Sequence, residues 1–413
     1  MTDAVRDLVA ENSWFTHFGL ISLGPVDGHD LPRLIHALRE VARLDRPVLL
    51  HVHTVKGKGY DFAEGDATRF HSPAPFRVTS TPDGKRVEIK KEGRSFTSAF
   101  SDALAGAMRR DPKILAATAA MPDGTGLDRI LAEFPGRAFD TGICESHALD
   151  MMSGLAKTGW KPFFAVYSTF LQRAFDQVFQ EAALQGLAVR LCLDRAGLVG
   201  GDGAVHHGFC DVSLLRVFPQ SCLMAAMDEP SLVAAIEFMR TYDAGVSAVR
   251  YPRDVVSDRF AAAPTPPFEI GRARPIVAPP DPQAAVLAYG TCTLDAAKAL
   301  DEIGSALRVA LYDARFAKPV DVELLRALLD AGVPVVTVED HGIEGGFGSC
   351  VIDAAVDAGL DARLIRRLAI PSRWIPHGSR SDQKRDTGID AAAIVTAVRE
   401  VAELGVAPNR SIS

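Results

Sequence analysis

The sequence has few of the features that mark several large classes of protein. Its 413 residues include only six cysteines, and no two of them form a C-x-x-C pair. Such pairs are the usual signature of zinc sites and redox centres, so we predict neither. Each cysteine lies in an apolar or strand-like stretch, which predicts buried, reduced thiols in a cytoplasmic protein. The six are Cys144, Cys192, Cys210, Cys222, Cys292 and Cys350.

Long hydrophobic runs and clusters of one charge are also missing. No stretch reaches the roughly 18 apolar residues that a membrane-spanning helix needs. The stretch MTDAVRDLVAENSWF lacks the basic start and apolar centre of a secretory signal. The formal net charge is -7, and there is no dense basic stripe. We therefore expect neither a membrane nor nucleic acid among the partners.

What the chain does contain is ordinary for a globular protein. Hydrophobic residues make up 47% and charged residues 23%, and the length is enough for two or three domains. Strand-like and helix-like segments alternate along most of it. This alternation predicts an α/β fold with parallel sheets flanked by helices.

Stretches rich in proline, glycine and charge divide the chain. They predict linkers at 73–95, with room for one hairpin, and at 261–283. Residues 1–72 resemble a βαβ fragment that begins abruptly, as the remnant of a domain. Residues 96–260 and 284–413 are the second and third predicted domains. An apolar strand such as VLLHVHTV is normally covered on both faces of its sheet. Because the first segment is only the remnant of a domain, we predict exposed apolar surface there.

Five predicted loops lie at the C-terminal ends of strands, where open α/β sheets hold their ligands. They are MPDGTG (121–126), ICESH (143–147), YSTFLQR (167–173), DRAGLVGGDGAVHHG (194–208) and YPRD (251–254).

Two kinds of charged residue in these loops are candidates for chemistry. Arg173, Arg195 and Arg253 carry planar guanidinium groups suited to phosphate, although each alone would also fit a surface salt bridge. Glu145 stands at the head of a segment that turns apolar, and burying a carboxylate is costly unless it has a partner. From the residues alone, Glu145 is either a functional carboxylate or a helix N-cap.

Taken together, these loops resemble one known family. The matching segments are GPVDGHD, AAMPDGTGL, YSTFLQRAFDQV, DRAGLVGGDGAVHHG, VRYPR, DARFAKP, GGFGS and HGSR, from about residue 18 to 390. They are similar to the C-terminal two-thirds of the 1-deoxy-D-xylulose-5-phosphate synthases, which are thiamine-diphosphate enzymes of the transketolase superfamily. The resemblance implies a thiamine-diphosphate-binding fold: a remnant of the diphosphate-binding domain, a pyrimidine-binding domain at 96–260 and a transketolase-type C-terminal domain at 284–413. It also implies a homodimer.

The resemblance assigns roles on the cofactor side. Glu145 would hydrogen-bond the aminopyrimidine ring of thiamine diphosphate and favour the imino tautomer that removes the thiazolium proton. Phe170 would stack on that ring, unless it is simply a core residue. Met121 and His71 would also contact the cofactor, His71 near the diphosphate and the bound intermediate.

Further roles follow on the substrate side. Tyr167, Arg173, Arg195, Asp202 and Arg253 would bind the phosphate and polar end of glyceraldehyde 3-phosphate.

His206 would hydrogen-bond a developing alkoxide or pass a proton, unless it only stabilises a turn. The implied reaction is the decarboxylative condensation of pyruvate with glyceraldehyde 3-phosphate, at the head of isoprenoid and thiamine biosynthesis.

The chain departs from the family pattern in several places. The G-D-G motif and the Asn that bind Mg²⁺ and the cofactor diphosphate have no counterpart, because GGDGA at 200–204 matches a different loop. Ser146 and His207 each replace a glutamine, and Asp254 replaces a glycine beside Arg253. Asp254 would either weaken a phosphate site by neutralising Arg253 or point away from it.

Three hypotheses follow from the missing motif. The chain is one part of a split synthase completed by a separate N-terminal half, or it has the fold without independent activity. Alternatively, it is a structural or regulatory subunit. A transketolase C-terminal subunit or a 2-oxo-acid dehydrogenase beta-type subunit would share the fold, but DRAG and STFLQR argue against both.

Overall fold

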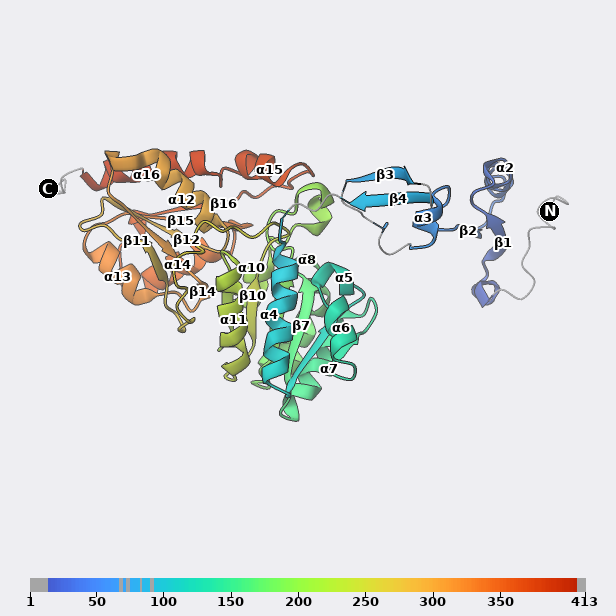
Figure 1. Ribbon diagram of the computed structural model, residues 1–413, viewed down its shortest axis with the longest axis horizontal. Coiled ribbons are helices and arrows are strands. Elements are labelled where there is room, and N and C mark those ends of the chain that lie inside the picture. Colours follow the sequence, from blue (N-terminus) through green and yellow to red (C-terminus); the bar gives the residue numbers. More distant parts are fainter. Residues whose placement is uncertain (1–13, 67–69, 72–74, 82–83, 90–92, 407–413) are drawn as a thin grey trace. The chain divides into compact units, whose positions relative to one another are not determined.

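The computed structural model describes residues 14–66, 70–71, 75–81, 84–89 and 93–406 (Figure 1). The chain divides into two compact units, Met1–Glu92 and Gly93–Ser413. We describe each unit by itself.

The first unit is built on a βαβ element. Strands β1 (Ile21–Asp27) and β2 (Val48–His53) pair in parallel, and helix α2 (Leu31–Val41) connects them. Exposed apolar side chains are present as predicted, with Val52 36% and Val55 42% exposed. The remaining elements are the 3-10 turn η1 (Trp14–Phe18), the short helix α3 (Asp61–Glu64) and the antiparallel hairpin β3 (Phe76–Thr81) and β4 (Gly84–Ile89).

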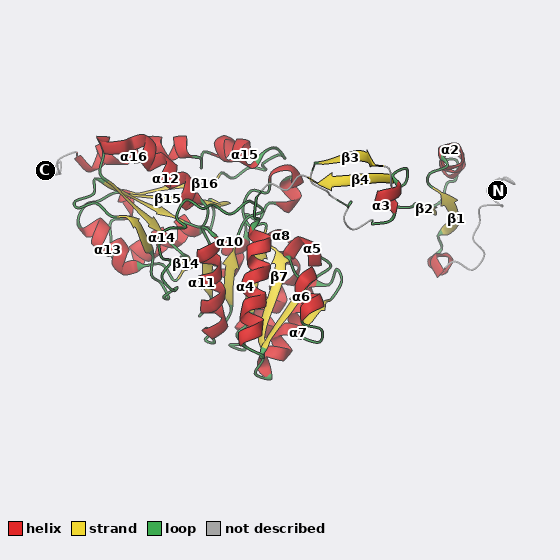
Figure 2. Ribbon diagram, viewed as in Figure 1, coloured by secondary structure: helices red, strands yellow, loops and turns green. Residues whose placement is uncertain are grey.

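The second unit contains a seven-stranded sheet in the order β14-β9-β10-β8-β7-β5-β6 (Figure 2). All neighbouring pairs are parallel except β14 with β9. Parallel strands joined through helices agree with the predicted fold class. The strands are β5 (Ile114–Thr118), β6 (Ala138–Asp140), β7 (Lys161–Tyr167), β8 (Arg190–Asp194), β9 (Cys222–Ala225), β10 (Ser247–Arg250) and β14 (Phe316–Lys318).

Helices cover both faces of this sheet. Helices α4 (Phe96–Arg110) and α11 (Glu229–Thr241) lie side by side and bury one face (Figure 1). Each begins at a capping side chain, since Ser95 accepts from Ser98 N and Asp228 from Ser231 N. The other face is covered by α7 (Glu145–Lys157) and the turns that follow β7. The remaining helical segments are α5 (Pro122–Thr125), α6 (Asp128–Glu133), α8 (Ser168–Leu171), η2 (Gln172–Ala174), α9 (Phe175–Gln177), η3 (Val178–Ala183), η4 (Gly200–Asp202), η5 (Ala204–His206) and α10 (Asp211–Leu215).

A five-stranded sheet follows, in the order β11-β13-β12-β15-β16, with β11 antiparallel to β13 and the other pairs parallel. Its strands are β11 (Arg274–Val277), β12 (Ala284–Ala288), β13 (Val309–Asp313), β15 (Val335–Gly342) and β16 (Ile365–Ile370). Its helical segments are α12 (Cys292–Ile303), η6 (Gly304–Ala306), α13 (Val322–Asp330), α14 (Phe347–Asp357), η7 (Ala362–Leu364), α15 (Arg380–Thr387) and α16 (Ala391–Val406).

The two sheets share one apolar core. A single cluster of buried side chains contains Leu149 and Met152 from α7, and also Leu287 from β12 and Phe347 from α14. Strand β14 reinforces the connection, because it comes from the third domain's sequence but pairs with β9 of the seven-stranded sheet. The second unit therefore behaves as one body.

Several predicted loops contain short helices instead. Segment 121–126 includes α5, and segment 167–173 forms α8 and η2. Glu145 is the first residue of α7 rather than part of a loop.

The prediction that all six thiols are buried is wrong for two of them. Cys144 is exposed and Cys210 is partly buried, while the other four are buried. Cys144 is exposed because it precedes α7 at the rim of the sheet, where the chain has already left the apolar core.

Among the described residues, no helix is long and apolar enough to cross a bilayer.

Candidate functional site

Five predicted site residues form a continuous stack at the C-terminal edge of the seven-stranded sheet. The Arg195 guanidinium lies 4.1 Å from the centre of the Tyr167 ring. The Tyr167 and Phe170 rings are nearly parallel, with centroids 5.7 Å apart. The Arg173 guanidinium then covers Phe170 at 4.4 Å and contacts Glu145 through a 2.6 Å ion pair. Cation–π contacts of this kind are favourable, so the stack orders its members.

Glu145 is a buried carboxylate with a specific partner. Its side chain is only 3% exposed, and its Oε1 accepts from Arg173 Nη1. Cys144 holds the N-cap position of α7, where no side chain makes a capping hydrogen bond, so Glu145 is not the N-cap. Glu145 stands in the first turn, where a carboxylate still stabilises the start of the helix. Ser146 Oγ donates to the carbonyl of Arg173 at 2.8 Å, which fixes the backbone that presents this arginine.

The 194–208 loop brings His206 and Asp202 to the same place. His206 packs edge-on against Phe170, with ring centroids 5.7 Å apart. Its Nδ1 lies 3.1 Å from the carbonyl oxygen of Asp202. The carboxylate of Asp202 pairs with Arg253, which comes from the 251–254 segment.

A cavity of about 380 Å³ lies beside this stack. Two of the three predicted phosphate arginines, Arg195 and Arg253, line it; Arg173 does not. The beginning of α4 also faces the cavity, and a helix N-terminus favours anions. The remaining lining residues are Ser95, Thr97, Ser98, Ser101, Asp123, Gly126, Asp128 and Arg129.

Arg195 has an unusual backbone, and its mostly buried side chain pairs with Asp194 at 3.0 Å. Its φ of 58° is in the left-handed region, which non-glycine residues seldom adopt and which often marks functional positions. Its Nε is buried without a hydrogen-bond partner among the described residues, and the same holds for Ser101 Oγ. Buried donors left without partners are costly, and both atoms are enclosed, so an anionic oxygen in the cavity would reach them only after the neighbouring side chains move.

Tyr167 lies in the middle of the stack, between Arg195 and Phe170. Burial raises the pKa of its hydroxyl, so the ring remains neutral at physiological pH. Its hydroxyl lies directly above Gly124, where a Cβ would stand only 2.0 Å away. Only glycine leaves room for the tyrosine at that position.

The remaining predicted residues lie elsewhere. His71 belongs to the first unit, where it is exposed and contacts Lys56. Met121 precedes α5 and packs, partly buried, on the shared core. Sequence reasoning did not single out Thr97, Ser101 or Arg129 in the cavity. The Ser- and Thr-rich start of α4 was a usable signal, because small hydroxyl residues at a helix N-terminus suit an anion.

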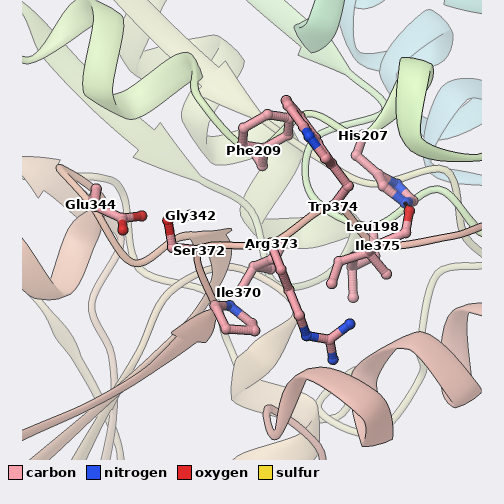
Figure 3. Close-up of a pocket in the computed structure, with 11 residues that line it drawn as sticks. Leu198, His207, Phe209, Gly342, Glu344, Ile370, Ser372, Arg373, Trp374 and Ile375 are labelled. Carbon is pink, nitrogen blue, oxygen red and sulfur yellow. Dashed lines mark hydrogen bonds between the residues drawn. The ribbon is translucent and has the colours of Figure 1, made fainter.

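A second cavity of about 280 Å³ is drawn in Figure 3. Its walls include His207, Phe209, Ile370 and Trp374, and none of the predicted site residues contributes to it. His207, for which the family pattern implies no role, is buried there. Trp374 packs edge-on against Phe209 at 5.7 Å and is 77% exposed.

The described residues fit one half of thiamine diphosphate better than the other. A buried carboxylate and an aromatic face, Glu145 and Phe170, suit an aminopyrimidine ring. At present the planar Arg173 covers that face and occupies Glu145 Oε1, so an entering ring would displace it. For the diphosphate and Mg²⁺, the described part of the chain offers no cluster of three or more His, Cys, Asp or Glu residues. We therefore derive no step through a metal ion.

Comparisons with known proteins agree with this fold. Residues 92–258 match the family described as transketolase, pyrimidine binding domain, and residues 274–394 match transketolase, C-terminal domain. Residues 1–54 match 1-deoxy-D-xylulose-5-phosphate synthase. Among solved structures, a split-gene transketolase described as an inactive beta4 tetramer aligns with a TM-score of 0.66 at 24% identity, over 76% of this chain and 100% of that chain. Transketolase from Leishmania mexicana aligns with a TM-score of 0.63 at 21% identity, over 78% of this chain and 48% of that one.

Curated relatives are more similar in sequence. 1-Deoxy-D-xylulose-5-phosphate synthase 1 of Geobacter sulfurreducens is 39% identical over 100% of this chain and 64% of its own length. The synthase of Anaeromyxobacter dehalogenans is 42% identical over 96% of this chain and 62% of its own length. The chain therefore spans just under two-thirds of the curated relatives that it matches.

The fold and the matched domains define a transketolase-type α/β protein with a pyrimidine-binding and a C-terminal domain. Within that class, residues 1–54 match the 1-deoxy-D-xylulose-5-phosphate synthase model, and nearly the whole chain is similar to curated synthases of that name.

Proposed function

We propose that this chain supplies the pyrimidine-binding and substrate-phosphate part of a thiamine-diphosphate-dependent 1-deoxy-D-xylulose-5-phosphate synthase. The substrates would be pyruvate and glyceraldehyde 3-phosphate, as the resemblance described above implies. A separate polypeptide completes the diphosphate and Mg²⁺ site. One observation carries the proposal: a single stack connects the buried carboxylate of Glu145 to the arginine-lined cavity through Arg173, Phe170, Tyr167 and Arg195.

When bound, thiamine diphosphate supplies a carbon nucleophile that accepts the keto acid and transfers two carbons to the aldehyde. The chain's own residues prepare this chemistry. With the cofactor bound, Glu145 would hold a proton at a ring nitrogen and Phe170 would fix the ring plane. His206, edge-on to Phe170, is placed to give or take a proton at a reacting oxygen.

The cavity would hold the phosphate end of the aldehyde substrate. Arg195 and Arg253 provide the cationic side, and Ser101 lines the same cavity. Asp202, paired with Arg253, keeps that guanidinium oriented until the phosphate arrives. Arg195, Asp202 and Arg253 lie on strand-end loops, whereas Ser101 lies in α4. Small shifts of those loops would therefore alter the affinity for the phosphate.

The split-gene transketolase subunit that aligns over its whole length was solved as an inactive beta4 tetramer. We propose that this chain is likewise inactive alone and forms a homodimer within the completed enzyme.

The test combines this chain with the N-terminal half of a family member. Thiamine diphosphate and magnesium are titrated by calorimetry into each protein and into the mixture, and product formation from both substrates is assayed. Binding and turnover only in the mixture are the expected result. No binding and no product in any combination would refute the proposed activity and favour a structural subunit that retains the fold.

The structural subunit is the second candidate function. It is favoured by one observation, the lack of a metal-binding cluster in the described part of the chain. The arginines of the cavity weigh against it, because a scaffold has no use for Arg195 and Arg253 converging on one cavity.

A further inference from the structure

A short segment of the C-terminal domain, residues 370–387, contacts both loops that carry the proposed phosphate residues. We call it the clamp segment. It leads from the end of β16 into α15. One of the two loops is 194–208, with Arg195, Asp202 and His206; the other is 251–254, with Arg253.

Arg380 contacts both loops at once. Its Nε donates to the carbonyl of Leu198 at 3.0 Å, and its Nη1 pairs with the carboxylate of Asp254. Its Nη2 donates to Asp340 Oδ2 at 2.9 Å and to Thr291 Oγ1 at 3.2 Å, which anchors the arginine in its own domain. The side chain is only 12% exposed, so these charge-assisted bonds are poorly screened by water.

Gln383 holds the 194–208 loop from a second position, one turn further along α15. Its amide group makes a reciprocal pair with Gly200, accepting from the backbone N–H at 2.9 Å and donating to the carbonyl at 3.1 Å. Gly200 stands two residues before Asp202, so this pair fixes the backbone that presents the carboxylate to Arg253.

His207 makes the third connection. Its Nδ1 accepts from Val199 N at 3.2 Å, so the ring proton is on Nε2, which donates to the carbonyl of Ile375 at 3.1 Å. Figure 3 places the His207 ring beside Leu198 and Ile375, where the loop meets the clamp segment. His207, the residue that follows His206, thus connects the 194–208 loop to the clamp segment.

Asp254 does not neutralise its neighbour Arg253. Its Oδ2 is taken by Arg380 and its Oδ1 accepts from Val255 N at 2.8 Å. Arg253 pairs instead with Asp202 across the two loops. The two departures from the family pattern at 207 and 254 therefore share a function: both connect a substrate loop to the clamp segment.

We infer that Arg380, with Asp254, Gln383 and His207, forms a set of positioning residues through which the C-terminal domain holds the Arg253–Asp202 pair in place for a phosphorylated substrate. The substrate class rests on the proposed function; the attachment of the loops does not. Without Arg380, both loops lose their common anchor, and the distance between Arg253 and Arg195 across the cavity is no longer fixed. Binding of one phosphate by two arginines is sensitive to changes in the distance between them.

The first test measures amide hydrogen exchange of the full chain by mass spectrometry. Arg380→Gln and Asp254→Asn are each expected to speed exchange at least tenfold in peptides covering 198–206 and 252–256, with α4 unchanged. Arg380→Lys should recover only part of the protection, because a single ammonium cannot reach Leu198 and Asp254 together. The matched control is Asp295→Asn, which removes the 2.5 Å Lys384–Asp295 pair that fastens α15 to α12 and contacts neither loop.

Wild-type exchange in both loops of Arg380→Gln and Asp254→Asn would overturn the inference. Equal acceleration in Asp295→Asn would also overturn it, because general loosening of α15 would then explain the effect.

The second test uses the chain completed by an N-terminal half. Arg380→Gln and Asp254→Asn should raise the KM for glyceraldehyde 3-phosphate about tenfold and leave the KM for pyruvate unchanged. An equal rise in both would contradict a role in positioning the phosphate pair. If no combination turns over, the proposed activity fails, while the exchange experiment on the chain alone still decides whether the clamp segment holds the loops.

Discussion

At the scale of single residues, the most informative side chain is Glu145. A carboxylate that is 3% exposed must be compensated, and Arg173 compensates it with an ion pair. Replacing one partner of such a pair leaves a buried charge, which costs more than the pair itself contributes. Arg173 compensates Glu145 within the chain itself. A cofactor ring that displaced the Arg173 guanidinium would have to donate a hydrogen bond to the same oxygen of Glu145.

The first prediction concerns this carboxylate. Glu145→Gln keeps the size and the hydrogen-bonding oxygen but loses the charge, so turnover of the completed enzyme should fall by roughly 10²–10⁴-fold. Steady-state assays with both substrates measure this. Glu133→Gln, at an exposed pair with Arg109, is the control and should retain wild-type turnover. A loss of turnover of less than threefold in Glu145→Gln would show that this carboxylate does not hold a proton for the reaction.

The second prediction concerns a buried histidine in the shared core. Burial lowers the pKa of His341 to about 4, and nearby Arg250 acts in the same direction while Asp211 opposes it. The folded protein therefore resists protonation, whereas the unfolded chain takes up a proton near pH 6.5. The contribution of neutral His341 to the free energy of unfolding is therefore complete above pH 6.5. It is lost as the pH falls towards 4.

Comparison with His341→Gln isolates that contribution. The difference in unfolding free energy between wild type and variant should shrink by about 3 kcal/mol from pH 7 to pH 4. Urea unfolding at a series of pH values measures it. A difference independent of pH would show that His341 does not titrate as described. The comparison is needed because Glu339 and Asp313, whose pKa burial raises to about 7, act with the opposite sign.

At the scale of elements, the short helix α5 determines the position of Tyr167. Gly124→Ala would place a Cβ 2.0 Å from the tyrosine hydroxyl, so the ring must move and the stack with Arg195 and Phe170 opens. We expect a loss of about 1–3 kcal/mol in stability and weaker binding of the phosphorylated substrate.

Calorimetric unfolding and the KM of the completed enzyme check this expectation. Gly154→Ala in α7 is the matched control, because no atom lies within 4 Å of its Cβ position and alanine favours a helix. It should be neutral or slightly stabilising. Equal stability and equal KM in Gly124→Ala and Gly154→Ala would mean that the Tyr167 ring moves aside without a loss of free energy.

At the scale of the whole molecule, the second unit is held together across its two sheets. Strand β14 caps the edge of the seven-stranded sheet, and Phe316 from this strand belongs to the core between that sheet and α4. A fragment of residues 93–264 would lack β14 and expose β9 as an edge strand, along with the apolar face that the third domain covers.

We predict that this fragment aggregates or elutes as oligomers in size-exclusion chromatography, whereas a fragment of residues 93–413 remains discrete and unfolds in one transition. A monomeric 93–264 fragment that unfolds cooperatively would contradict the shared core. This prediction needs neither cofactor nor partner.

The fold class and much of the site followed from local patterns. Alternating apolar segments marked the parallel strands, and the loops at their ends contained Glu145, Tyr167, Arg195 and Arg253. The short helices α5 and α8 were missed, because their sequences carry the glycine and hydroxyl residues that usually indicate loops. The roles of the site residues and the exact domain boundaries remain predictions.

The sequence by itself determined the alternation of strands and helices along the chain and the types of residue near the strand ends, because periodicity and motif spacing are local properties of the chain. Only the tertiary structure decided which of those residues meet. It paired Glu145 with Arg173, left Arg195 Nε without a partner, and turned Asp254 towards Arg380. Such pairings join residues as far as 126 positions apart. They depend on how sheets and helices pack in space, which no local pattern specifies.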